Sequence, residues 1–239
     1  VVDELDEEAR ITGHPDLPRR SVFHARNPRA AARRAARRLK RPYRECNLIV
    51  AHVGGGVSVG AHRRGRVVDV NNALDGDGPF TPERTGSLEL LPFLRYVAER
   101  GMSPDDARRM VTREGGLRAH LGTHDTAEIE RRIEAGSEGD RVVYRAFIGR
   151  IARAIGAAAA GFSGRVDGIV ITGGVARGRI FVRGLRTMVR FLAPVIVVPG
   201  SLEMEALAES ALEVCSGAVE AKVYTHESED GKVVSGGDR

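Results

Sequence analysis

The sequence predicts an α/β protein, and three observations support this class. Short apolar runs of strand length lie between glycine-rich turns, and longer stretches repeat their apolar residues with helical spacing. The first three runs follow one another closely, as in an antiparallel meander, whereas the later ones alternate with helices, as in a parallel sheet. The 239 residues are 42% hydrophobic and 29% charged, which indicates a folded protein of one or two domains and excludes a disordered one.

The meander comes first. A tight turn at Arg64-Gly65 separates its second and third strands, and the three predicted strands are 47–53, 57–61 and 66–70. A long insertion follows, from Asn71 to about Gly136. It begins with a loop rich in Gly, Pro and Asp and continues into three helices, near 87–100, 104–113 and 125–135.

The alternating part comes after the insertion. Its predicted elements are a helix at about 138–162, a strand at 166–172, a helix at about 178–191, a strand at 195–198 and a helix at 203–216. Without the insertion the order is βββαβαβα. That order predicts a ribonuclease-H-like (actin-like) half domain with a helical insertion, and only one such half is present.

Three parts of the chain are expected from these elements. Residues 1–45 are a remnant of a preceding lobe with a basic connecting helix. Residues 46–223 are the half domain, with its insertion at about 71–136, and the polar residues 224–239 are a disordered tail.

The formal net charge is +5, and much of the excess lies between Arg26 and Arg41, which contains eight Lys or Arg residues and no acid. Such a run can bind nucleic acid. Its alanines and paired arginines at helical spacing favour instead a solvated helix face, and no aromatic residues interleave with the charges. Nucleic acid is therefore not the expected partner.

Several classes of protein are excluded by simple features. No apolar run approaches the length of a membrane-spanning helix, and the acidic start VVDELDEEAR lacks the apolar region of a secretory signal. Cys46 and Cys215 provide neither a disulfide framework nor a metal-binding pair. We expect a cytoplasmic protein with no membrane partner.

Two glycine turns mark the candidate site. The triplet Gly54, Gly55 and Gly56 lies between two strands, and neither a P-loop nor a dinucleotide fingerprint is present. Glycines there permit positive φ and a close approach of backbone N–H groups to an anion, and Ser58 adds a hydroxyl. A hairpin that merely needs glycines is the alternative, but three in a row favour a phosphate cradle.

The second turn, Gly173-Gly174, follows an apolar strand and precedes a helix. Ligands of open α/β sheets bind at the carboxyl ends of the strands. The two turns together therefore predict a nucleotide in a cleft. The loop from Asn71 to Gly86 is stiffened by prolines, and its Arg84 is flanked by groups that could hold and aim it.

The block HVGGGVSVGAHRRGRVVDVNNALDGDGPFTPER (52–84) resembles the acetate and butyrate kinase family, and within it the butyrate kinases. Five other segments agree with the family: VVDELD (1–6), SVFHARN (21–27), LGTHD (121–125), ITGGVA (171–176) and APVIVVPG (193–200). The resemblance extends from residue 1 to about residue 220. It implies an actin-like fold and reversible transfer of the ATP γ-phosphoryl group to a short-chain fatty acid, with Mg²⁺, in a homo-oligomer.

The resemblance also implies roles for individual residues. His24 hydrogen-bonds the transferring phosphoryl group, Arg84 stabilises it, and His52 is the second active-site histidine. Gly54, Gly55 and Gly56, with Ser58, form the phosphate loop. Gly173, Gly174 and Asp125 contact the nucleotide, and Phe23 lines the acyl pocket. The family usually has G-E-D-E where this chain has Gly200-Ser201-Leu202-Glu203, so Glu203 is the remaining candidate for holding Mg²⁺.

The chain begins where the N-terminal lobe of the family is nearly over. An alternative function is therefore a nucleotide-binding module without catalytic activity. The sequence leaves three hypotheses to be compared: a carboxylate kinase, an inactive nucleotide-binding module and a nucleic-acid binder.

Overall fold

The computed structural model describes residues 5–217, residue 220 and the pairs 226–227 and 233–234. Its contacts divide the chain into two compact units, Val1–Glu203 and Met204–Arg239, and each is described by itself. The first unit contains the sheet and the candidate site. The helix α8 (Glu203–Cys215) starts at the last residue of the first unit, and the rest of it belongs to the second. Also in the second unit, the two-residue strands β6 (His226–Glu227) and β7 (Val233–Val234) pair antiparallel.

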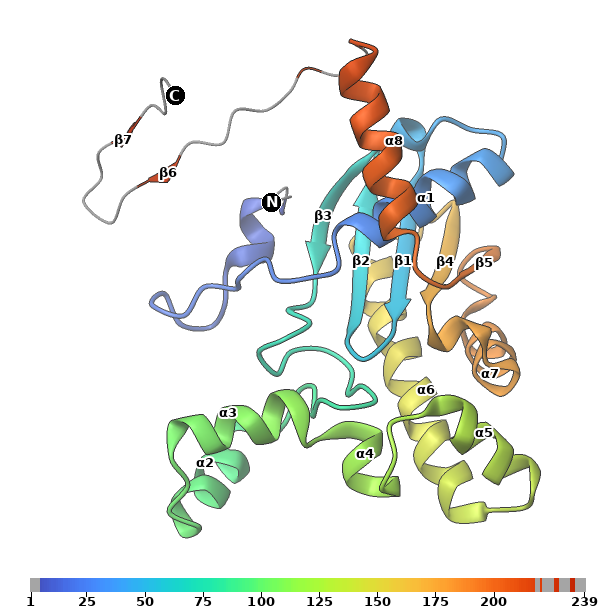
Figure 1. The fold of residues 1–239 in the computed structure, drawn as a ribbon. Coiled ribbons are helices and arrows are strands. Elements are labelled where there is room, and N and C mark those ends of the chain that lie inside the picture. Colours follow the sequence, from blue (N-terminus) through green and yellow to red (C-terminus); the bar gives the residue numbers. More distant parts are fainter. Residues whose placement is uncertain (1–4, 218–219, 221–225, 228–232, 235–239) are drawn as a thin grey trace. The chain divides into compact units, whose positions relative to one another are not determined.

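One five-stranded sheet organises the first unit (Figure 1). Its order is β3-β2-β1-β4-β5. The first three strands pair antiparallel, whereas β1 with β4 and β4 with β5 pair parallel. The strands are β1 (Asn47–Val53), β2 (Val57–Arg63), β3 (Arg66–Val70), β4 (Gly168–Gly173) and β5 (Val195–Pro199).

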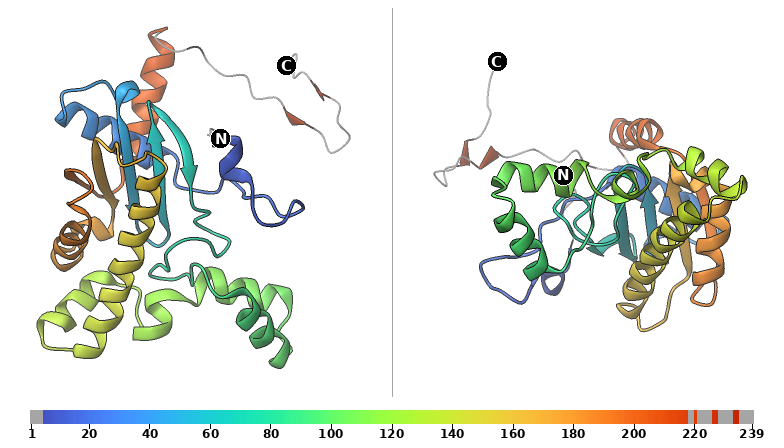
Figure 2. Two further views of the ribbon diagram at one scale, coloured as in Figure 1. Left: turned by 180° about the vertical axis from the view of Figure 1, so that it is seen from behind. Right: turned by 90° about the horizontal axis from the view of Figure 1, so that it is seen from below.

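Helices cover both faces of this sheet (Figure 2). The long α6 packs on one face against β1 and β2 and also contacts α7, whereas α1 packs against β1, β4 and β5. The α-helices of this unit are α1 (Arg26–Arg38), α2 (Leu90–Glu99), α3 (Pro104–Arg113), α4 (Gly116–Leu121), α5 (Thr126–Glu134), α6 (Glu138–Ala160) and α7 (Arg179–Val189). Short 3₁₀ turns occur at Glu7–Arg10, Tyr43–Glu45 and Val175–Arg177.

The alternation of side chains along β1 explains the two covered faces. Ile49, Ala51 and Val53 belong to the main core cluster, together with apolar residues of α6 and α7. The residues between them point to the opposite face, where the alanines of α1 are buried. Small alanines allow α1 to approach the sheet closely, while Arg26, Arg37 and Arg38 are exposed.

The carboxyl ends of β1, β4 and β5 meet at one edge of the sheet. Gly173 has φ of +95°, and a side chain there would overlap the carbonyl oxygen of Val53 at the end of β1. Gly173 and Gly200 also exchange two backbone hydrogen bonds, of 3.2 and 2.8 Å. Glycine is therefore required at Gly173, and the turns after the three strands lie next to one another.

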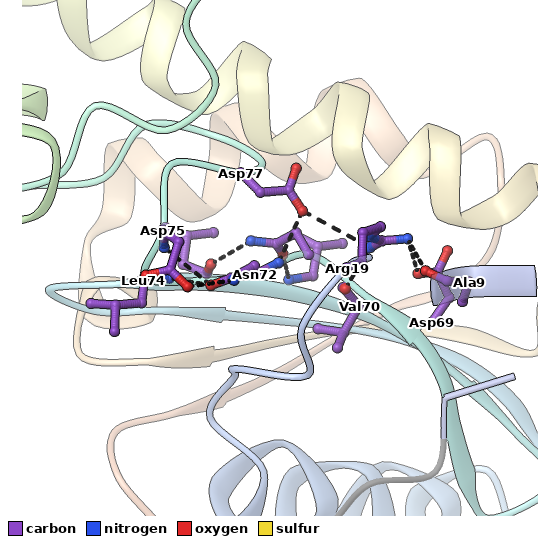
Figure 3. Close-up of polar contacts among 11 residues, drawn as sticks. Ala9, Arg19, Asp69, Val70, Asn72, Leu74, Asp75 and Asp77 are labelled. Atoms are coloured by element: carbon purple, nitrogen blue, oxygen red, sulfur yellow. Dashed lines mark hydrogen bonds and ion pairs between the residues drawn. The ribbon is translucent and has the colours of Figure 1, made fainter. Parts of the chain in front are cut away.

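A polar network fixes the beginning of the loop that follows β3 (Figure 3). Arg19 donates to the Asp69 carboxylate at 2.9 Å and to the Val70 carbonyl at 2.6 Å. In the loop, Asn72 donates to Asp77 through its backbone and to Asp75 through its side chain. The residues before α1 thus hold both β3 and the loop that leads to Arg84.

The element order confirms the predicted βββαβαβα arrangement with a helical insertion. Among the α-helices and the strands of the five-stranded sheet, the six-residue α4 was not predicted, and β2 is two residues longer than expected. Apart from β6 and β7, the predicted disordered tail lies outside the described residues. Among the described residues, no helix has the length and apolar character needed to span a membrane.

Candidate active site

His52 and Ser58 are brought together by the register of the meander. They are directly paired across β1 and β2, so their side chains lie on the same face of the sheet. Both are buried, with 8% and 1% of their surfaces exposed. This is the face that α1 covers, and His24 immediately precedes α1.

Ser58 holds His24 beside His52. The backbone N–H of His24 donates to Ser58 Oγ at 3.3 Å, and His24 Nδ1 lies 2.8 Å from the same oxygen. The two imidazole rings stack with their centres 4.2 Å apart and their planes 24° from parallel. The structure thus brings together three of the predicted site residues from two separate parts of the chain.

Arg84 reaches the same place from the insertion. A Cβ placed on Gly56 would lie 2.6 Å from Arg84 Nη1 and 3.0 Å from His24 Cε1. Gly56 therefore has no room for a side chain, because the guanidinium and the imidazole flank its backbone. Arg84 also donates to the carbonyl of Ala73, so its side chain is held within its own loop.

Thr81 joins the loop of Arg84 to the glycine triplet, and the sequence analysis did not identify it. Its hydroxyl donates to the carbonyl of Gly55 at 2.7 Å and accepts from the backbone N–H groups of Glu83 and Arg84 at 3.1 and 2.9 Å. A threonine two or three residues before an arginine in a turn is a weak local signal for this arrangement. The link to Gly55 is visible only in the fold.

The glycine triplet differs from the expectation in one respect. Gly54, Gly55 and Gly56 are absent from the glycines with positive φ, so backbone conformation is not the reason for them. Close approach is the reason at Gly56, whereas at Gly54 and Gly55 a Cβ would make only ordinary contacts of 3.4 Å. The prediction of positive φ was therefore wrong.

Both histidines are uncharged at neutral pH. Burial and the neighbouring His24 lower the pKa of His52 to about 3, from an ordinary value of 6.5. Burial also lowers the pKa of His24, as does the Arg84 charge, while Glu203 acts in the opposite direction. The site therefore combines two neutral imidazoles, which can donate hydrogen bonds, with one permanently charged guanidinium.

The predicted nucleotide contacts are in two places. Gly173 ends β4 at the sheet edge described above and Gly174 follows it, and a Cβ on Gly174 would meet open space. Asp125 is exposed at the N-cap of α5, where its carboxylate accepts from the backbone N–H of Ala127 at 2.9 Å. None of the contacts described for Asp125 joins it to His24, His52 or Arg84.

Glu203 and Phe23 are the two remaining predicted site residues. Glu203 is exposed, and its charge influences His24. Among the described residues, no group of three His, Cys, Asp or Glu side chains forms a metal cage. A role of Glu203 in holding Mg²⁺ therefore stays a prediction. Phe23 packs, partly buried, against Leu5, Val67 and Val70, so its role in an acyl pocket stays a prediction.

Sequence comparisons identify the family. The model of the acetokinase family matches residues 16–194. A probable butyrate kinase of Oleidesulfovibrio alaskensis is 49% identical over 226 residues, which cover 91% of this chain and 61% of that protein. Butyrate kinase 2 of Clostridium acetobutylicum is 43% identical over 224 residues, covering 94% and 63%. The chain thus spans about three fifths of the length of these relatives.

Structure comparisons show the fold. Acetate kinase of Porphyromonas gingivalis has a TM-score of 0.79 at 23% identity, covering 87% of this chain and 60% of that one. Acetate kinase of Entamoeba histolytica has a TM-score of 0.76 at 15% identity, covering 87% and 63%. These neighbours confirm the predicted actin-like fold class. The family model, which matches residues 16–194, shows that the chain belongs to the acetokinase family.

Proposed function

We propose that this chain carries the phosphoryl-transfer half of a carboxylate kinase, which moves the γ-phosphoryl group of ATP reversibly to a short-chain fatty acid. The observation that carries the proposal is the convergence of His24, His52 and Arg84 on the backbone of the glycine triplet. These groups come from three separate segments, and the fold holds each by contacts that do not require a ligand.

The chemistry of the reaction suits this set of side chains. A fatty acid is already ionised at neutral pH, so its attack on phosphorus needs no general base. The difficulty is the negative charge of a metaphosphate-like group that passes between two anions. Arg84 supplies positive charge and paired N–H donors for the phosphoryl oxygens. Neutral His24 and His52 add hydrogen bonds, and the buried setting strengthens all three interactions.

The nucleotide is proposed to bind at the same edge of the sheet, beside the glycine triplet. Next to Gly173, Gly174 leaves open backbone on which adenosine can lie, and Asp125 provides a polar contact from the insertion. Glu203 would hold Mg²⁺ together with the nucleotide phosphates. Bound there, the metal would neutralise charge on the β- and γ-phosphates.

The acyl substrate is proposed from the relatives. Proteins named butyrate kinase or probable butyrate kinase match at 43–49% identity. Butyrate or a branched analogue is therefore the proposed acceptor, with Phe23 on the acyl side of the site. The partial length of the match makes the activity of the isolated chain a question for experiment.

The test is a phosphotransferase assay with ATP, Mg²⁺ and acetate, propionate, butyrate or isobutyrate. It is run on the 239-residue chain and on a version extended by the coding sequence upstream of Val1, with ADP binding measured by calorimetry. We expect acyl phosphate from at least the extended version, and more from butyrate or isobutyrate than from acetate. Nucleotide binding without acyl phosphate in either version would contradict the proposal and identify an inactive nucleotide-binding module.

A further inference from the structure

Asn27 is a buried polar residue that the proposed chemistry does not yet use. It lies in the first turn of α1, and none of its surface is exposed. Its single amide group bridges the ends of three strands. The amide nitrogen lies 2.9 Å from Nδ1 of His52 and 3.3 Å from the carbonyl oxygen of Gly200, and the amide oxygen faces Thr172 and Leu202.

Two backbone groups determine the positions of the amide nitrogen and the amide oxygen of Asn27. The backbone N–H of Leu202 can only donate, and it lies 3.4 Å from the Asn27 oxygen. The Gly200 carbonyl can only accept, and it lies 3.3 Å from the Asn27 nitrogen. Turning the amide over would place two donors together and two acceptors together in a buried space. The amide nitrogen therefore faces His52.

This orientation determines the tautomer of His52. An amide N–H donates, so Nδ1 of His52 must accept and cannot carry a proton. Since the low pKa of His52 keeps the ring neutral, its one N–H is on Nε2. That atom points to the glycine triplet, because a Cβ on Gly54 would lie 3.4 Å from it.

We propose that Asn27 is a positioning residue that locks His52 in the Nε2–H tautomer, so that the ring donates a hydrogen bond into the glycine crevice. That the acceptor is a phosphoryl oxygen rests on the proposed function. The other tautomer would present a lone pair to an anion and would repel it. Through Gly200 and Leu202, the same amide also ties the segment before Glu203 to the His52 ring.

The first test measures the tautomer directly in the wild-type chain. Long-range ¹H–¹⁵N correlation spectra of ¹⁵N-histidine-labelled protein at pH 7 distinguish protonated from unprotonated ring nitrogens, and His52→Gln identifies the His52 signals. We expect a protonated Nε2 and an unprotonated Nδ1. A proton on Nδ1, or a doubly protonated ring, would overturn the proposal.

The second test changes the partner. In Asn27→Asp a carboxylate oxygen replaces the donor, so we expect the proton of His52 to move to Nδ1. We also expect kcat in the active form of the protein to fall about 100-fold with little change in KM for ATP. Retention of the Nε2–H tautomer by a folded Asn27→Asp variant would contradict the proposal.

Tyr43→Phe is the matched control. Tyr43 Oη lies 2.8 Å from Nδ1 of another buried histidine, His62, on β2 outside the site. Its loss should leave the ring signals of His52 unchanged, and a shift of the His52 proton in this variant would contradict the specific role of Asn27. The expected tautomer together with no acyl phosphate from either the 239-residue chain or its extended version would contradict the proposed function and support the tautomer assignment.

Discussion

Arg84 is held from two sides before any substrate binds. Its backbone N–H donates to Thr81 at 2.9 Å, and its guanidinium donates to the Ala73 carbonyl. A pre-positioned charge lowers the energy of the transition state more than that of bound ATP. We therefore expect Arg84→Ala to lower kcat by about 10²–10³-fold while the Kd for ATP changes by less than about tenfold. Steady-state kinetics and calorimetry test this.

The matched control for Arg84 is Arg109→Ala. Arg109 is an exposed arginine of α3 that pairs with Asp106 and Glu114 at the surface. Arg109→Ala also removes one positive charge, but from the exposed surface of α3. It should change kcat by less than about twofold, because exposed ion pairs contribute little to the stability of the fold. Equal losses of kcat and of ATP affinity in Arg84→Ala would contradict the role given to Arg84.

His52 makes a prediction about stability and pH. Its pKa is about 3 in the folded chain and 6.5 as the ordinary value. Between these values the unfolded chain binds a proton that the folded chain does not. The free energy of unfolding is therefore unaffected by the protonation of His52 above pH 6.5 and decreases as the pH falls below it. The slope approaches about 1.4 kcal/mol per pH unit near pH 5.

The measurement is urea unfolding of wild type and His52→Gln from pH 7 to pH 4. The wild type should lose stability more steeply than the variant as the pH falls. His14→Gln, at an exposed histidine, should follow the wild type. Parallel curves for wild type and His52→Gln would show that His52 titrates normally.

Among the elements, α5 and α7 are joined by one buried carboxylate. Glu130 of α5 accepts from the backbone N–H groups of Ile180 and Phe181 in the first turn of α7, at 3.1 and 2.9 Å, and from the Tyr144 hydroxyl at 3.1 Å. Burial and Glu130 both raise the pKa of Tyr144, so this hydroxyl remains a donor. Glu130 thus completes a helix end that has no side-chain cap of its own.

We expect Glu130→Ala to lower the free energy of unfolding by roughly 2–4 kcal/mol, because donors in a largely buried site lose their acceptor. Glu130→Gln keeps the volume and one acceptor oxygen and should be less destabilising. Glu134→Ala, at an exposed position of the same helix, should change stability by less than about 0.5 kcal/mol. A Glu130→Ala chain as stable as wild type in urea would refute this account of α7.

The elements were predictable where their signals are local. The strands at 47–53 and 66–70 and the helix at 104–113 have the predicted bounds. Short apolar runs fix the strands, and Ser103 with Asp106 forms a capping box that starts α3. By contrast, α4 has only six residues and begins at Gly116, so its sequence carries no helical period. Its burial against α6 is a property of the tertiary structure.

The site was predictable to the extent that its residues have recognisable chemistry. His24, His52, Arg84 and the glycines lie in segments that resemble the family, and the fold gathers the histidines, the arginine and Gly56. Asn27 and Thr81 were missed because their roles depend on contacts with residues far along the chain, Gly200 and Gly55. No local pattern in a sequence reports such contacts.

At the scale of the whole molecule, the parallel strands place three chain turns at one edge of the sheet, and α1 and the insertion add side chains to it. The central claim is that this edge binds the phosphoryl group in transfer. The most direct measurement is a crystal structure of the active form with Mg²⁺, ADP, aluminium fluoride and butyrate. Aluminium fluoride mimics the phosphoryl group between the two anions.

We predict that the fluoride atoms lie within about 2.7–3.1 Å of donors on His24, His52 and Arg84, above the glycine triplet. Aluminium fluoride bound elsewhere, with these three side chains contacting neither it nor ADP, would contradict the account.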